Sequence, residues 1–116
     1  MKIEFSNEKA ALIMKIDGEI DHRYATRIRR EADRKIVTYP EKTFIIDLSS
    51  VSFMDSSAIG VIIGRYKLVK SFGSEVFLVS CSESVGKILS MSGIEKIIKI
   101  FDTLPDALNN VQRKDK

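Results

Sequence analysis

Several residue types are scarce in this chain, and their scarcity narrows what the protein can be. Its 116 residues include one cysteine, one histidine and no tryptophan. The single cysteine, Cys81, excludes an internal disulfide, which agrees with a reducing compartment. No set of Cys and His residues has the spacing of a metal site, so we expect no bound metal.

Long apolar runs are missing as well. No run of about 18 apolar residues is present, which excludes a transmembrane helix. We therefore expect no association with a membrane. The first five residues, 1–5, lack the apolar stretch of a signal peptide. We therefore expect a cytoplasmic protein. Cys81 follows the apolar run 76–79, and we expect its small side chain to be mostly buried.

The charge is modest but unevenly spread. A net charge of +3 comes without the aromatic residues or motif of a nucleic-acid-binding domain, so we expect no direct nucleic-acid partner. Six cations gather in one segment at or beside helical spacing: Arg23, Arg27, Arg29, Arg30, Arg34 and Lys35. They form either a solvated helix face or a basic surface that helps an acidic partner approach.

The first half of the chain alternates strand-like and helix-like segments. Residues 10–16 predict a strand ended by Gly18, and residues 3–5 predict a short strand that pairs with it as a hairpin. Asp21 is the predicted N-cap of a helix that runs to about residue 37. Its predicted buried stripe is Ala25, Ile28, Ala32 and Ile36. The apolar run 44–48 predicts a central strand.

The second half continues in the same way. We expect a helix over 56–71 with Gly73 at its end, a strand over 75–79, and a helix from the cap Ser82 to residue 91. A last strand is predicted over 96–101, and Thr103 caps a short helix with Pro105 in its first turn. Four residues of this last helix are expected to face inward: Leu104, Ala107, Leu108 and Val111.

These elements predict a single α/β domain with about four α-helices. The sheet is expected to be mixed, with an N-terminal hairpin followed by parallel strands. The domain should span residues 1–112, with a frayed tail over 113–116. Sites in such sheets form at the carboxyl ends of strands, so the predicted loop 49–55 is the expected place of the site.

The helix predicted over 56–71 divides into two unlike faces. Its predicted core face is Ala58, Ile59, Ile62, Ile63, Tyr66 and Val69, flanked by Val61, Leu68 and Phe72. The opposite face is small and polar: Ser56, Ser57, Gly60, Gly64, Lys67 and Ser71. Each glycine costs a helix about 1 kcal/mol relative to alanine. The two glycines therefore indicate tolerated flexibility, tight packing within the domain, or a low surface on which another chain can lie.

Asp55, Ser56 and Ser57 stand at the start of this helix. Aspartate and serine are preferred helix caps, which is one sufficient reason for them to be there. A helix N-terminus also offers free backbone N–H groups and positive dipole, which favour a phosphate by about 0.3–1 kcal/mol. Phosphorylation at this point should therefore leave the fold intact while adding charge to a partner contact.

No catalytic constellation competes with this interpretation. The one histidine, His22, follows the predicted cap Asp21 and has nothing else in its favour as a triad member. The chain has no Gly-rich phosphate loop. We expect neither enzymatic activity nor a cofactor.

Three sequence blocks resemble the STAS-domain anti-anti-sigma factors, and they extend over nearly the whole chain. They are 18–22 (GEIDH), 52–67 (SFMDSSAIGVIIGRYK), and 91–94 (MSGI) with 96–98 (KII). The ending 64–67 (GRYK) is similar to the sporulation branch, which acts on sigma F, more than to general-stress relatives. Two residues depart from the pattern: Ala58 where the family usually has glycine, and Arg23 where the sporulation branch often has histidine. Because of these two differences, the protein can also belong to a paralogous regulatory system.

The resemblance implies a partner switch. The unphosphorylated protein would bind an anti-sigma factor that is also a serine kinase, and so release the sigma factor. The kinase would then phosphorylate Ser56, the serine directly after the aspartate, and a serine phosphatase would reset the switch. The implied partner-binding residues are Asp21, Asp55, Ser57, Gly60, Gly64, Arg65 and Lys67. Arg65 either makes an edge contact or anchors the helix internally.

Three other functions remain open on the sequence. The same mechanism can serve a stress-response sigma pathway instead of sporulation. Some STAS domains bind nucleotides or lipids, so a small-ligand sensor is a second alternative, although no phosphate loop supports it. A purely structural assembly module is the third.

Overall fold

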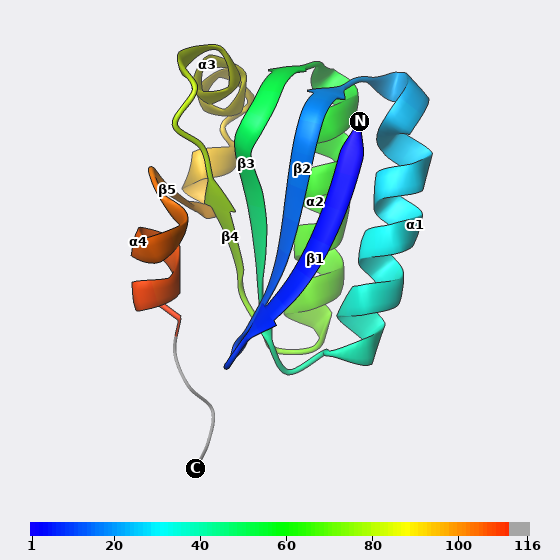
Figure 1. Cartoon of the computed structure of the whole chain (residues 1–116), viewed down its shortest axis with the longest axis vertical. Helices are drawn as coiled ribbons and strands as arrows, with labels where there is room; N and C mark the ends of the chain where they lie inside the picture. Colours follow the sequence, from blue (N-terminus) through cyan, green and yellow to red (C-terminus); the bar gives the residue numbers. More distant parts are fainter. Residues whose placement is uncertain (112–116) are drawn as a thin grey trace.

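One sheet of five strands runs through the molecule, in the order β1-β2-β3-β4-β5 (Figure 1). The computed structural model describes residues 1–111. In chain order the elements are β1 (Lys2–Glu8), β2 (Ala11–Ile20), α1 (His22–Thr38), β3 (Thr43–Met54), α2 (Ser56–Ser71), β4 (Val76–Val79), α3 (Glu83–Ser92), the 3₁₀ helix η1 (Ile94–Lys96), β5 (Lys99–Phe101) and α4 (Leu104–Asn109). β1 is antiparallel to β2 and the other neighbouring strands are parallel. Over the described residues the predicted mixed sheet with four α-helices is confirmed.

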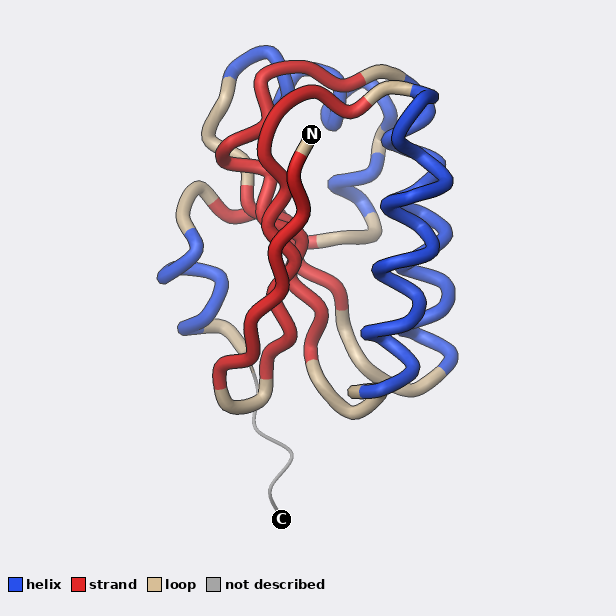
Figure 2. The backbone as a smooth tube through the Cα atoms, turned by 45° about the vertical axis from the view of Figure 1, so that its right-hand side comes forward, coloured by secondary structure: helices blue, strands red, loops and turns tan. Residues whose placement is uncertain are grey.

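Helices cover the two faces of the sheet unequally. Alternate residues of β2 and β3, such as Leu12 and Ile46, join the larger core beneath α1, α2 and α3. Residues of the opposite parity, such as Ile13 and Ile45, join a smaller core beneath α4. Figure 2 shows α1 and α2 on one side of the strands and α4 on the other. This asymmetry makes α1 and α2 the main scaffold, with α2 between α1 and the later elements.

Polar caps set the helix starts as the sequence predicts. Asp21, Asp55, Ser82 and Thr103 each accept a hydrogen bond from a backbone N–H in the first turn of their helix. Such a bond satisfies one of the N–H groups that a helix start leaves free. The buried stripe of α1 is Ile28, Ala32 and Ile36, with Ala25 half-buried.

The strand β3 is longer than its apolar run predicts. The expected loop over 49–55 is wrong, because the strand continues to Met54. Residues 50, 51, 53 and 54 pair with the end of β2, where Asp17 lies opposite Ser50 and Ile20 opposite Met54. Val51 and Met54 are buried in this extension, so pairing and burial together offset the weak strand preference of its serines.

Gly18 lies inside β2 and does not end it. The register between β2 and β3 shifts around this residue, which marks an irregularity in the pairing. Gly18 has a φ of +111°, and a Cβ there would lie 3.3 Å from Met1 Cα. The positive φ therefore favours glycine, a Cβ would also crowd Met1, and the strand continues beyond this residue.

Two further expectations near the C-terminal half need correction. The last strand begins at Lys99, because Ile94–Lys96 form a 3₁₀ turn whose backbone bonds run from Ile97 and Ile98 to the Ile94 carbonyl. Cys81 is exposed, not buried, because β4 ends at Val79 and Cys81 belongs to the connection before α3.

The short helix α4 packs as predicted, with Ala107 buried and the neighbouring Leu104, Leu108 and Val111 against the smaller core. The predicted tail over 113–116, together with residue 112, lies outside the described residues. Within residues 1–111 no helix combines the length and the apolar character that crossing a bilayer requires.

Candidate functional site

Two parallel strands end side by side at the edge of the sheet where α1 and α2 begin, at the top of Figure 1. The last residues of β2 and β3, Ile20 and Met54, are register partners. The next residues are the caps Asp21 and Asp55, and the Asp55 N–H donates to the Ile20 carbonyl at 3.2 Å. The sheet therefore places two helix caps that are far apart in the sequence on neighbouring strand ends.

Ser56 is the first residue of α2 and is exposed to solvent. Its hydroxyl makes no hydrogen bond to any of residues 1–111. The neighbouring Ser57 is half-buried, and its backbone N–H donates to Asp55 Oδ1 at 2.9 Å. Of the two serines, Ser56 therefore offers the more accessible hydroxyl, at the positive end of a helix.

Gly60 and Gly64 follow on the same side of α2, with the exposed Lys67 beyond them. A Cβ added to either glycine would meet nothing within 4 Å. Tight packing within the domain is therefore not the reason for these glycines. Tolerated flexibility and a low surface for another chain remain as explanations. Ser56, Gly60, Gly64 and Lys67 follow one another along one side of the helix, and we call them the bare face of α2.

The buried side of α2 is rotated relative to the predicted one. Val61 and Arg65 are buried, whereas Ile59 and Ile63 are half-buried and Phe72 is 44% exposed. The helical periodicity assigned Arg65 to neither face of the helix. The long side chain instead lies between α2 and α1.

Arg65 is paired with Asp33, a residue of α1 that the sequence analysis did not single out. Arg65 Nε lies 2.8 Å from Asp33 Oδ1, and Arg65 is 7% exposed. The two atoms are in ionic contact without the angle of a hydrogen bond, and Arg65 Nη1 is buried with no hydrogen-bond partner within residues 1–111. Burial lowers the pKa of Arg65, Asp33 opposes that shift, and the like charge of Arg29 adds to it. Of the two roles left open for Arg65, this environment matches the internal anchor.

Asp21 faces a different environment from Asp55. Arg23 donates to the Asp21 carboxylate from its backbone N–H at 2.9 Å and from Nη2 at 2.7 Å. These contacts, led by the side-chain hydrogen bond, lower the pKa of Asp21. Arg23 therefore offsets the negative charge at one of the two caps.

Phe53 is a second residue that the sequence analysis passed over. It is 48% exposed and precedes Ser56 by three positions, near the end of β3. The available signal was the alternation of β3, in which Met54 points inward and Phe53 outward. Its ring adds apolar surface near the end of β3.

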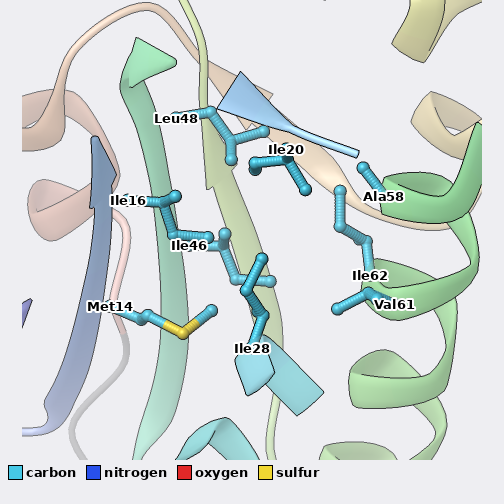
Figure 3. A pocket seen from close by; sticks show the side chains of 9 residues that line it. All are labelled: Met14, Ile16, Ile20, Ile28, Ile46, Leu48, Ala58, Val61 and Ile62. Atoms are coloured by element: carbon cyan, nitrogen blue, oxygen red, sulfur yellow. The ribbon is translucent and has the colours of Figure 1, made fainter. Parts of the chain in front are cut away.

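The apolar gap between the sheet and the two large helices is small (Figure 3). It is lined by Met14, Ile16, Ile20, Ile28, Ile46, Leu48, Ala58, Val61 and Ile62, and has a volume of about 10 Å³. Pockets for drug-sized ligands measure about 300–1,000 Å³, whereas one water needs about 10–15 Å³. This gap offers no room for an acyl chain or a nucleotide base.

Comparisons with known proteins agree with this geometry. The sequence profile of the STAS domain matches residues 2–107. An anti-sigma F factor antagonist from Paenibacillus polymyxa is 34% identical over 112 residues, 97% of this chain and 96% of its own. An anti-sigma-B factor antagonist from Bacillus subtilis is 31% identical over 102 residues, 86% of this chain and 90% of its own.

A solved structure agrees as well. A crystal structure from Thermotoga maritima, provisionally classed as an anti-sigma factor antagonist, superimposes with a TM-score of 0.87 at 26% identity. It covers 96% of this chain and 95% of its own. The profile match and the near-complete overlap with these relatives establish that the chain belongs to the STAS domain family.

Proposed function

We propose that this protein is a cytoplasmic anti-sigma factor antagonist whose bare face on α2 binds an anti-sigma factor, and that phosphorylation of Ser56 ends this binding. The observation that carries the proposal is the exposed Ser56 hydroxyl, free of hydrogen bonds within residues 1–111, at the start of a shallow glycine-lined surface. The antagonist relatives supply the kind of partner. The role is regulatory and not enzymatic.

In the proposed complex each site residue has a distinct part. Ser56 supplies the hydroxyl that a serine kinase modifies, and Asp55 and Asp21 shape its surroundings. Gly60 and Gly64 let the partner approach the helix backbone, while Ser57 and Lys67 border the contact. Arg65 supports the site from inside by fixing α2 against α1.

The charge of one phosphate is sufficient for the switch. A phosphoserine carries about −1.5 to −2 charges at neutral pH. At the N-terminus of α2 the dipole and free N–H groups tolerate that charge, so the fold persists. In a closed interface without a cation to receive it, repulsion and desolvation oppose binding. A 1,000-fold loss of affinity corresponds to about 4.1 kcal/mol.

The first experiment locates the phosphate. We expect incubation with the cognate anti-sigma kinase and ATP to add one phosphate, and mass spectrometry of the digested protein to place it on Ser56. The variant Ser57→Ala should still be modified, whereas Ser56→Ala should not. Modification of Ser57 in the wild-type protein would contradict the assignment.

A binding measurement tests the switch with a matched control. Ser56→Asp should weaken anti-sigma binding by about 100-fold or more, because it places a negative charge in the closed interface. A 100-fold loss corresponds to about 2.7 kcal/mol. Ser84→Asp places the same charge near the start of α3, where Ser84 is also exposed. That control should bind the anti-sigma factor with the affinity of the wild-type protein. Unchanged affinity of Ser56→Asp would contradict the proposal.

The regulated pathway has two candidates. We propose the sporulation factor sigma F, which the anti-sigma F relative supports. The anti-sigma-B relative supports a stress-response pathway. Pull-down with the unphosphorylated protein, followed by identification of the captured kinase, distinguishes them. A serine phosphatase that acts on phosphorylated Ser56 would complete the cycle.

A further inference from the structure

The helix α1 has a second surface, on the side away from its contact with α2. Arg27, Arg30, Arg34 and Lys35 line a groove between α1 and β1, together with Phe5 and Glu31. The groove has a volume of about 320 Å³ and is open to solvent. Figure 1 shows β1 as the outermost strand with α1 beside it. We call this groove the β1–α1 groove.

The positive charge in the β1–α1 groove is not fully compensated. Arg27 pairs with Glu31 at 2.9 Å, and Lys35 Nζ lies 5.6 Å from the centre of the Phe5 ring. Arg30 and Arg34 are exposed, and neither guanidinium forms an ion pair with any of residues 1–111. Two free guanidinium groups therefore face solvent beside the strand.

The backbone of β1 offers a second kind of recognition at the same place. β1 is the terminal strand of the sheet, so its outer edge has no neighbouring strand within the described part of the chain. An edge strand presents unpaired N–H and C=O groups that an extended segment of another chain can pair with. The carboxylates Glu4 and Glu8 do not oppose this on the groove side, because they alternate with Phe5 to the other face.

We propose that the β1–α1 groove binds an extended acidic segment of a partner protein, which adds to the edge of β1 while its carboxylates meet Arg30 and Arg34. Arg27 to Arg34 span seven positions, about 10 Å along the helix, and about three residues of extended chain match that length. Alternation along the added strand would turn every second side chain toward the arginines. An acidic peptide fits better than a nucleic acid, since one half-buried ring, Phe5, offers little stacking surface.

The proposal is independent of Ser56, and a synthetic peptide tests it on the full chain. The probe is an acetylated, amidated decapeptide of alternating Glu and Thr, which places all its carboxylates on one face. We expect it to bind by calorimetry and to shift the NMR signals of β1 and α1 amides. Arg30→Glu combined with Arg34→Glu should weaken binding by about tenfold, roughly 1.4 kcal/mol, with an unchanged thermal melt.

A charge-matched control and a backbone control make the outcomes decisive. Lys87→Glu combined with Lys96→Glu reverses the same charge at exposed residues of α3 and η1, and should leave binding unchanged. Peptides N-methylated on odd or on even residues should differ in affinity, because only one set of amides would face β1. No binding, equal loss in both double variants, no difference between the methylated peptides, or tighter binding of single-stranded DNA would each overturn the proposal.

Discussion

The two large helices of this protein occupy equivalent places on one face of the sheet, yet they present opposite surfaces. α1 buries a regular apolar stripe and projects long cations into solvent. α2 buries an arginine and exposes glycine and serine. Charges on α1 act at a distance and are screened by salt, whereas contacts on α2 need close approach. An added side chain should therefore weaken partner binding more on α2 than on α1. An added charge on α1 should leave the fold intact.

The first way to test this contrast is to break the ion pair that joins the two helices. Asp33→Ala leaves the buried Arg65 without its partner, and breaking a buried pair costs about 3–5 kcal/mol. The Asp33 side chain is 38% exposed, so solvent screening reduces the expected loss to about 1–3 kcal/mol. Urea unfolding followed by circular dichroism measures the change.

The pair on the outer side of α1 provides the control. Glu31→Ala removes the partner of Arg27, whose side chain is 49% exposed, and should cost less than about 1 kcal/mol. Arg65→Met, which removes the buried charge and keeps much of the volume, should be less harmful than Asp33→Ala. Equal losses for Asp33→Ala and Glu31→Ala would show that Arg65 is not an internal anchor.

Local chemistry explains why most of the fold could be predicted. Helix starts carry Asp, Ser or Thr, and the hydrogen bonds that cap them span only two or three residues. The apolar runs of β2 and β3 specify strands by composition. Both signals act within a few residues, so the order of strands and helices was predicted correctly.

Tertiary pairing explains the errors. The serines at 49–52 suggest a loop, but β2 lies alongside and extends the ladder to Met54. Gly18 signals a strand end, but it serves a bulge held against Met1. The role of Arg65, which the sequence left open, depends on Asp33, which α1 places opposite it. None of these neighbours is adjacent in the sequence, so composition and periodicity could not reveal them. The candidate site was predicted from Asp55, Ser56 and Ser57 at the start of a helix, which is a local signal, whereas the choice of Ser56 over Ser57 came from the family resemblance.

Substitutions of the two α2 glycines should change stability and partner binding in opposite directions. Gly60→Ala and Gly64→Ala should each stabilise the protein by about 0.5–1 kcal/mol, because alanine is the better helix former and space is free at both positions. Both should weaken anti-sigma binding, since a methyl group would obstruct the bare face. Thermal unfolding and calorimetric titration measure the two effects.

Gly86 in α3 is the matched control for these substitutions. A Cβ there also meets nothing within 4 Å, so Gly86→Ala should bring a similar gain in stability. It lies outside the bare face, and binding should stay at the wild-type value. If all three alanine variants bind equally well, the glycines of α2 are tolerated and do not form a docking surface.

The smallest expected effect concerns the cap of α1. Arg23 lowers the pKa of Asp21 chiefly through its side-chain hydrogen bond. A lowered folded-state pKa contributes stability above the unfolded-state value, and this contribution is lost as pH falls through the folded-state pKa. Arg23→Ala should therefore raise the pKa of Asp21 toward its ordinary value and flatten the acid side of the stability profile, as carboxyl NMR titration would measure. Arg30→Ala removes an equal charge from the same helix without touching Asp21, and it should leave that pKa nearly unchanged. If both variants shift the pKa of Asp21 equally, net charge controls the cap and the contact with Arg23 does not.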